Sequence, residues 1–109
     1  MQFVFSVPPA APRDVSIINF GSTWIKLKWN DIVPLKYSSI SHHEITYIDH
    51  NGCGKTTIEN RNLAVHITGL TPETMYEFVV VAINSTGGVI GKSQPSNLVQ
   101  CRTTILSKQ

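Results

Sequence analysis

The chain of 109 residues has the length of one domain, and 41% of its residues are hydrophobic while 15% are charged. This composition argues against a disordered chain. The net charge of +2 comes from scattered lysines and arginines, and neither a basic cluster nor a membrane-length apolar run occurs, so we expect no nucleic-acid partner and no direct membrane contact.

Strand and loop patterns alternate in the first part of the chain. A proline-rich stretch at residues 8–12 resembles an interdomain linker, and residues 14–20 then indicate a first strand. Residues 23–30 alternate apolar and basic side chains, which is typical of a half-buried strand. Residues 30–41 predict a long loop whose apolar side chains fold down onto the domain.

The second part of the chain predicts five more strands and no helix. Asn51-Gly52 is the strongest hairpin signal, and residues 85–96 predict a glycine-rich loop. Residues 78–83 are apolar without a break, whereas a strand with one face in water should alternate apolar and polar residues. The five strands cover residues 42–49, 55–60, 63–70, 76–84 and 97–104.

Seven strands at short, regular spacing, with no lasting helical periodicity, predict an all-β fold. The pattern is typical of a seven-stranded Greek-key sandwich of the immunoglobulin-like kind. In such a sandwich only one face of a strand packs into the core. The second apolar face of residues 78–83 therefore needs another explanation.

Four separated motifs occur in the order shown by one family of β-sandwich domains. Trp29 closes the second strand, and Tyr47 lies in the third. Leu70, Pro72 and Tyr76 have the spacing Leu-x-Pro-x-x-x-Tyr of a tyrosine corner, in which the Tyr hydroxyl bonds to an upstream backbone group. The strand that starts at Tyr76 then reads Tyr-x-Phe-x-Val-x-Ala-x-Asn. The chain thus resembles a fibronectin type III domain.

The resemblance implies domain boundaries and a sheet arrangement. The domain covers residues 8–104, with residues 1–7 as a linker or the end of a preceding repeat and residues 105–109 as a C-terminal linker. Strands one, two and five form one sheet, and strands three, four, six and seven form the other. His43 departs from the family, which usually has an aromatic residue there. The expected core is Val15, Ile17, Ile25, Leu27, Trp29, Ile40, Ile45, Tyr47, Leu63, Val65, Ile67, Leu70, Tyr76, Phe78, Val80, Ala82 and Val99.

No catalytic site, metal site or cofactor is expected. Cys53, His43 and His50 lack the signature of a nucleophile with an adjacent base and an orienting group. His42 and His43 point to opposite faces of a strand, and His42 and His50 lie about 26 Å apart at the rise of a strand. We therefore expect a protein that is not an enzyme and has no small-molecule substrate.

The sequence contains candidates for two independent covalent modifications, an N-glycan and a disulfide. Asn84-Ser85-Thr86 is an acceptor for N-glycosylation. Under the implied fold, two strands separate Cys53 from Cys101, a gap of about 10–15 Å, whereas a disulfide needs Cα atoms within about 7 Å. Either the turn folds across the sheet and the two form a disulfide, or Cys101 is a small buried hydrophobe and Cys53 an exposed thiol.

The outward positions of the sixth strand are the main indication of a binding surface. The core does not need Val79, Val81 and Ile83, and Ile48 on the third strand is expected beside them. Large exposed apolar strips often mark contacts between proteins. The four residues are therefore a candidate protein interface, unless the long loop or a linker covers them.

The resemblance implies a non-catalytic module for protein interaction and spacing, in the extracellular part of a multidomain cell-adhesion molecule or receptor. Neural adhesion receptors of the Dscam type are one candidate group. The partners would be other protein domains, bound homophilically or heterophilically, and neighbouring repeats of the same chain. The alternative is an accessory repeat of a secreted carbohydrate-active enzyme or of an intracellular muscle filament protein. The Arg-Gly-Asp tripeptide that some family members use to bind integrins is absent.

Overall fold

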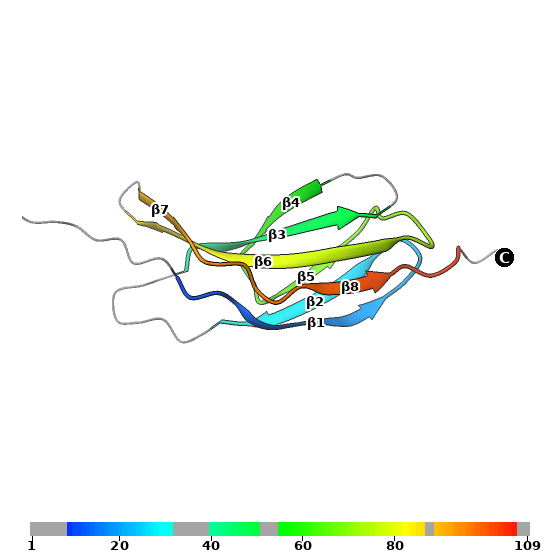
Figure 1. The fold of residues 1–109 in the computed structure, drawn as a ribbon, viewed down its shortest axis with the longest axis horizontal. Helices are drawn as coiled ribbons and strands as arrows, with labels where there is room; N and C mark the ends of the chain where they lie inside the picture. Colours follow the sequence, from blue (N-terminus) through cyan, green and yellow to red (C-terminus); the bar gives the residue numbers. More distant parts are fainter. Residues whose placement is uncertain (1–8, 32–39, 51–54, 87–88, 107–109) are drawn as a thin grey trace, which may run out of the picture.

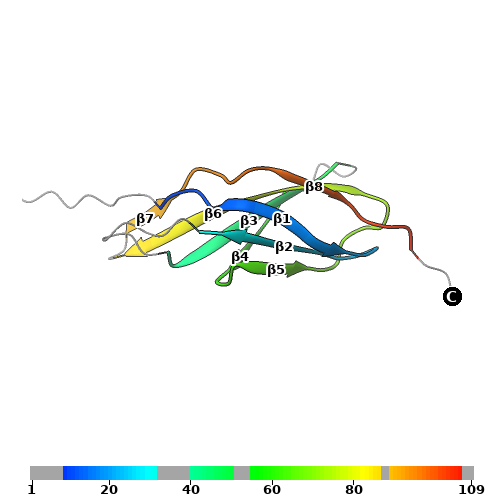
Figure 2. The same cartoon turned by 90° about the horizontal axis from the view of Figure 1, so that it is seen from below.

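Eight strands form two facing sheets in the computed structural model, which describes residues 9–31, 40–50, 55–86 and 89–106. None of these ranges contains a helix, and so none contains a helix suited to crossing a membrane. The sheets lie as two layers along a shared long axis (Figure 1, Figure 2). The strands are β1 (Arg13–Phe20), β2 (Ile25–Asn30), β3 (His42–Asp49), β4 (Lys55–Asn60), β5 (Ala64–Ile67), β6 (Met75–Thr86), β7 (Val89–Lys92) and β8 (Val99–Arg102).

The strand order confirms the predicted sandwich of two antiparallel sheets. One sheet has the order β1-β2-β5, and the other has the order β4-β3-β6, with β7 and β8 both paired to β6. β7 pairs with the C-terminal part of β6, and β8 pairs with its N-terminal part. β6 is therefore the central strand of the larger sheet.

The predicted glycine-rich loop contains an additional strand, β7. Its residues pair with the end of β6 as the second arm of a hairpin, in which Gly91 lies opposite Asn84. A glycine inside a strand weakens the sequence signal for that strand. The prediction of a glycine-rich loop over all of residues 85–96 was wrong, because Val89–Lys92 form a strand.

Two serines keep the chain paired with β6 between β7 and β8. The Ser93 N–H donates to the Ala82 carbonyl at 2.9 Å, and the Ser93 hydroxyl oxygen accepts from the Ala82 N–H at 2.8 Å. Ser96 makes the same two bonds with Val80, at 2.8 and 2.9 Å. The hydroxyl oxygens take the place of strand carbonyls, so the backbone of β6 stays hydrogen-bonded across the gap.

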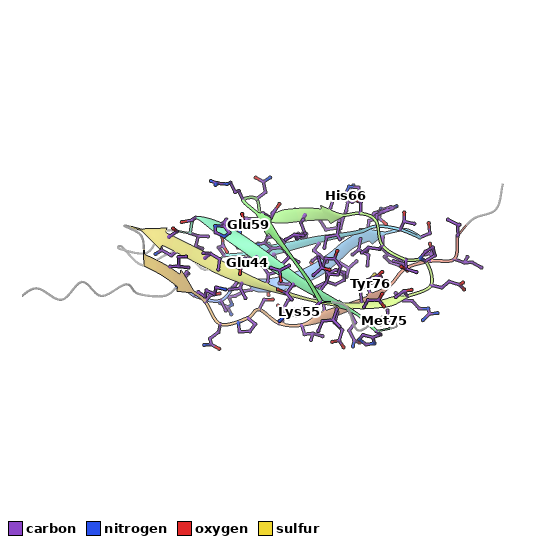
Figure 3. The ribbon with its side chains drawn as sticks, turned by 90° about the horizontal axis from the view of Figure 1, so that it is seen from above. Glu44, Lys55, Glu59, His66, Met75 and Tyr76 are labelled. Carbon is purple, nitrogen blue, oxygen red and sulfur yellow. The ribbon has the colours of Figure 1, made fainter. Side chains whose placement is uncertain are left out.

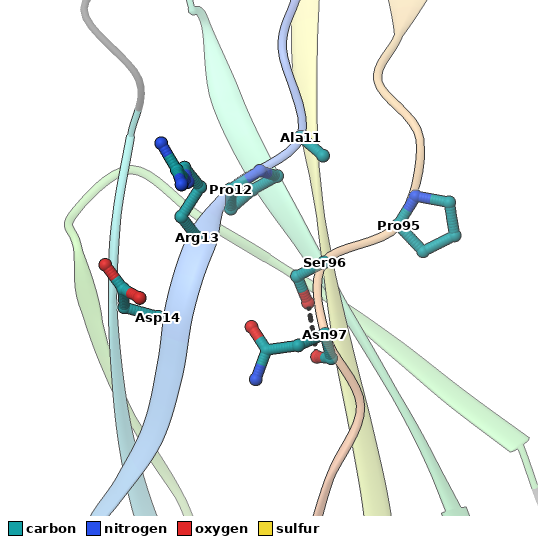
Figure 4. A pocket seen from close by; sticks show the side chains of 7 residues that line it. All are labelled: Ala11, Pro12, Arg13, Asp14, Pro95, Ser96 and Asn97. Carbon is teal, nitrogen blue, oxygen red and sulfur yellow. Dashed lines mark hydrogen bonds between the residues drawn. The ribbon is translucent and has the colours of Figure 1, made fainter.

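The neighbouring Asn97 ties the two sheets together at one edge. Its side chain accepts a hydrogen bond from the Val15 N–H and donates one to the Val15 carbonyl, both at 3.1 Å. Val15 belongs to β1, which contacts β8 across this edge. Asn97 therefore bonds to both backbone polar groups of Val15 in β1, and Figure 4 shows its side chain beside this strand.

The core lies between the sheets and contains most of the residues predicted for it. Leu63 is exposed, in contrast to the prediction, because it lies in a bend before β5 begins. Five predicted core residues are only half-buried: Ile17, Ile40, Tyr47, Val65 and Val99. The buried hydrophobic residues are Val15, Ile25, Leu27, Trp29, Ile45, Ile67, Leu70, Tyr76, Phe78, Val80, Ala82, Ile83 and Cys101.

The tyrosine corner has the geometry that the resemblance implies. The Tyr76 hydroxyl accepts a hydrogen bond of 2.8 Å from the Thr71 N–H, five residues upstream. Leu70 and Tyr76 are both buried, and the Leu70 N–H donates to the Thr23 carbonyl at 2.9 Å. The corner therefore links the start of β6 to the turn before β2.

His43 fills the position at which the resemblance implies an aromatic ring. It is buried, and its ring lies edge-on to Trp29 with centroids 5.2 Å apart. Its Nε2 lies 2.9 and 3.1 Å from the two carboxylate oxygens of Asp31. His43 thus acts as an aromatic core residue whose buried Nε2 has Asp31 as its partner.

Replacing Asp31 by alanine should destabilise the domain by about 1–3 kcal/mol, because the buried Nε2 of His43 loses its partner. In a His43→Phe background the same replacement should cost far less, since phenylalanine has no polar atom to satisfy. Urea unfolding of all four proteins measures both effects in one double-mutant cycle. Equal losses in the two backgrounds would show that Asp31 does not act through His43.

Candidate protein-interaction surface

The outer face of the five-stranded sheet displays alternate side chains of β3, β4 and β6 in rows across the strands. Figure 3 shows Glu44 and Glu59 side by side on β3 and β4, with Lys55 farther along β4. The rows place Ile48 between Lys55 and Glu77, Thr46 between Thr57 and Val79, and Glu44 between Glu59 and Val81.

An apolar patch lies on this face, and we call Ile48, Val79 and Leu98 the outer patch. Ile48 is 39% exposed, Leu98 is 53% exposed and Val79 is half-buried. With Thr46 they line a shallow depression of about 40 Å³ whose walls are almost entirely apolar. The structure therefore brings together two of the predicted interface residues and adds Leu98.

Leu98 was missing from the predicted interface, although the sequence contains a signal for it. Val99 and Cys101 face the core, so the alternation of a strand places Leu98 and Gln100 on the outer face. Extending that alternation one residue before β8 is enough to find Leu98.

Ile83 is not exposed, which corrects the predicted interface. It is only 2% exposed, and Val81 is half-buried. The Lys92 Nζ lies 3.4 Å from Glu44 Oε1, and these residues belong to strands on opposite sides of β6. Their long side chains meet above β6, so their methylene stems cover the apolar residues beneath.

A second polar cluster borders the other end of the outer patch. Glu77 Oε1 accepts a hydrogen bond of 2.7 Å from the Gln100 amide and lies 3.0 Å from His50 Nε2. The bond from Gln100, followed by the effect of His50, holds the pKa of Glu77 below its ordinary value. The outer patch thus lies between two groups of paired polar side chains.

A fibronectin type III domain model matches residues 10–99. The chain belongs to the fibronectin type III family. This match covers both sheets, from the residues before β1 to the first residue of β8. It agrees with the tyrosine corner and with the two-sheet strand order.

Relatives contain this kind of domain as a small part of a longer chain. Bovine receptor-type tyrosine-protein phosphatase F is 35% identical over 89 residues, which cover 74% of this chain and 5% of that protein. Human fibronectin type-III domain-containing protein 3A is 31% identical over 109 residues, which cover 94% of this chain and 8% of that protein. The chain therefore spans less than a tenth of these curated relatives.

Solved structures agree on the fibronectin type III fold. The fibronectin type III domain of human fibronectin type III domain containing protein 3 has a TM-score of 0.68 at 27% identity, covering 95% of this chain and 94% of that chain. The twitchin kinase region from C. elegans has a TM-score of 0.75 at 23% identity, covering 91% of this chain and 17% of that chain. Both confirm the sandwich architecture.

Three potential metal ligands of this fibronectin type III domain lie close together at the Glu44 end of the face. Donor atoms of His42, Glu44 and Glu59 lie within 4.8 Å of one another. The sequence did not indicate this group, because Glu59 belongs to a different strand from His42 and Glu44. Lys92 already supplies a positive charge to Glu44 at 3.4 Å, and His42 Nε2 lies 3.9 Å from Glu59 Oε1. Within this group, Glu44 therefore already has the Lys92 ammonium as a partner.

Cys101, one partner of the predicted disulfide, is a buried thiol, and the disulfide with Cys53 stays a prediction. Cys101 lies opposite Tyr76 and packs in the core between the sheets. Burial raises the pKa of its thiol and makes it a poor nucleophile. Cys53 lies outside the described residues.

Asn84, the predicted glycosylation acceptor, lies inside β6 opposite Gly91 and is only 7% exposed. The folded strand presents little of this side chain to an enzyme. A glycan would therefore have to be attached before β7 pairs with β6. The use of Asn84 remains a prediction.

A hollow of about 480 Å³ lies beside the start of β1 rather than on the outer face (Figure 4). Asn97 in its wall is already bonded to Val15, and the Ser96 hydroxyl donates to the Asn97 carbonyl at 2.9 Å. The remaining polar side chains, Arg13 and Asp14, are exposed.

Replacing Glu77 by glutamine should reduce the pH dependence of stability. The folded pKa of Glu77 lies below its ordinary value of 4.5, so its stabilising effect is complete above that value and is lost as the pH falls through the lowered pKa. The variant should lose less stability than the wild type between about pH 6 and about pH 3. Urea unfolding at both pH values measures this, and parallel losses would show that Glu77 contributes nothing.

Proposed function

We propose that this fibronectin type III domain is a non-catalytic module for protein interaction and spacing in the extracellular part of a multidomain cell-adhesion molecule or receptor. The outer patch is its contact surface. The observation that carries the proposal is the apolar group formed by the exposed Ile48 and Leu98 and the half-buried Val79, which lies between the Glu44–Lys92 ion pair and the polar cluster of Glu77, Gln100 and His50.

The composition of this face suits a protein partner. Protein interfaces combine an apolar centre with a polar rim, and the outer patch and its two polar clusters have that arrangement. The depression of about 40 Å³ is far smaller than the roughly 300–1,000 Å³ of small-molecule pockets. The depression has room for part of one side chain, so a partner protein could insert one apolar side chain there.

The path of the chain suits a spacer. β1 begins toward one end of the long axis, and the segment after β8 leaves at the other end (Figure 1, Figure 2). Domains joined through such ends line up in a row. Each added repeat would then extend a multidomain chain by about its own length.

One relative supports a setting in a receptor. The receptor-type tyrosine-protein phosphatase is named as a receptor, and the matched segment is 5% of its length. Chicken CNTN1 domains FN1–FN3 have a TM-score of 0.68 at 24% identity, which supports the fold alone. A repeat within a longer receptor is therefore the setting we propose for this chain.

Replacing Ile48 and Leu98 together by lysine should weaken partner binding more than tenfold, because two charges enter the apolar centre of the contact. Surface plasmon resonance against immobilised cell-adhesion ectodomains measures the affinity. The melting temperature should change by only a few degrees, because both side chains are substantially exposed.

The matched control replaces Ile18 and Ile90 by lysine, since both are exposed apolar residues outside the outer patch. This control should bind like the wild type. Equal affinity of the outer-patch variant and the wild type, or an equal loss in the control, would contradict the role of the outer patch.

A second candidate function is that of a structural repeat in an intracellular filament protein. Disulfides and N-glycans are marks of secreted chains. Cys101 is a free buried thiol, and Asn84 is almost fully buried. These two observations favour a chain that carries neither a disulfide nor an N-glycan, as an intracellular protein would.

Antibody staining separates the two functions. An antibody raised against this domain should stain intact cells that express the parent protein, because the extracellular proposal places the domain outside the membrane. Cells permeabilised with detergent provide the positive control. Staining only after permeabilisation would reject the extracellular proposal and support the filament alternative.

A further inference from the structure

We propose that β4 is a pairing edge for a second copy of this chain, in a two-fold antiparallel contact centred on Thr57. The contact would extend the five-stranded sheet of one copy into that of the other. It uses the edge of the sheet rather than the outer patch. The biological role of this homophilic contact rests on the proposed function of the domain in protein interaction.

β4 is a free and regular edge. Among the described strands it pairs only with β3, and its six residues match β3 without a register shift. It contains no proline and no glycine. An edge of this kind presents a row of unpaired backbone groups that can bind another strand.

The other edges are less suited to pairing. β1 has two register shifts, and Asn97 occupies backbone groups of Val15. Pro95 interrupts the chain between β7 and β8. β5 has only four residues, and its own two-fold pairing about Val65 would place Ala64 opposite His66 without any charge pair.

The charges of β4 select one register for a symmetric pair. A two-fold axis perpendicular to the sheet keeps the outer faces of both copies on the same side, so opposite residues must share a face. With the axis at Thr57, Lys55 of each copy lies opposite Glu59 of the other. Figure 3 shows Lys55 and Glu59 toward the two ends of β4, as this pairing requires.

The neighbouring registers lose this complementarity. Moving the axis by one residue in either direction leaves Thr57 opposite Lys55 or opposite Glu59, and both ion pairs are lost. Opposite charges facing each other across strands stabilise the pair, and a register without them has no such contribution. The pattern of charges therefore specifies both the partner and the alignment.

The side chains along the edge are free to make these contacts. Lys55 is exposed, and Glu59 is 76% exposed with His42 as a neighbour at 3.9 Å. At the axis, the Thr57 hydroxyl lies 3.1 Å from the Thr46 hydroxyl on β3. This bond directs the small Thr57 side chain toward its own sheet and leaves room for the second copy.

Sedimentation equilibrium of the 109-residue chain at low ionic strength tests the proposal. The wild type should dimerise weakly, with a dissociation constant in the range of roughly 0.1–1 mM, since a contact of six residues per copy is small. Lys55→Glu and Glu59→Lys should each weaken dimerisation about tenfold, because each change turns both symmetry-related pairs into like-charge pairs. The double variant Lys55→Glu/Glu59→Lys should restore dimerisation.

Lys28→Glu is the matched control, because it makes the same charge change at an exposed site on the other sheet. It should dimerise like the wild type. A chain that stays monomeric at all concentrations would overturn the proposal. So would single reversals without effect, or a double variant that does not recover.

A single outer-patch variant separates this proposal from the proposed function. Leu98→Lys, at a site on the far side of β6 from β4, should leave dimerisation unchanged and weaken only heterophilic binding. Loss of dimerisation in this variant, with normal dimerisation of the β4 variants, would overturn the role of β4 and identify the outer patch as the homophilic surface. The proposed function would stand in that case.

Discussion

The pairing of β6 with three other strands is the constraint on which most of the structure depends. β3 pairs with eight consecutive residues of β6, from Tyr76 to Ile83, while β7 and β8 divide the other side between them. Ser93 and Ser96 continue the hydrogen bonding where neither strand is present. A central strand of twelve residues has two faces to cover, and its unbroken apolar run follows from that position.

The two faces of β6 have different roles. Its inner face packs Phe78, Val80 and Ala82 into the core. Its outer face is divided: an ion pair between neighbouring strands covers one half, whereas Val79 stays accessible beside Ile48 and Leu98. A single strand therefore stabilises the sandwich and contributes to the surface that we propose for binding. The free edge of β4 belongs to the same sheet, so both proposed contacts are positioned by β6 through β3.

The sequence was sufficient to predict the fold but only part of the candidate site. Alternation along a strand and the tyrosine corner depend on residues close together in the chain, so they can be read locally. Ile83 lies beside the ion pair of Glu44 and Lys92, and these two residues are far from it in the chain or on the unexpected strand β7. The same holds for His43, whose burial depends on a bond to Asp31 twelve residues away.

The outer face of the five-stranded sheet is divided into a covered half and an accessible half. Methyl NMR with a soluble paramagnetic relaxation agent tests this division directly, because the agent broadens signals of exposed methyl groups. We expect strong broadening for Ile48, Val79 and Leu98 and protection of Ile83. Equal broadening of Ile83 and Val79 would show that the ion pair of Glu44 and Lys92 does not cover β6.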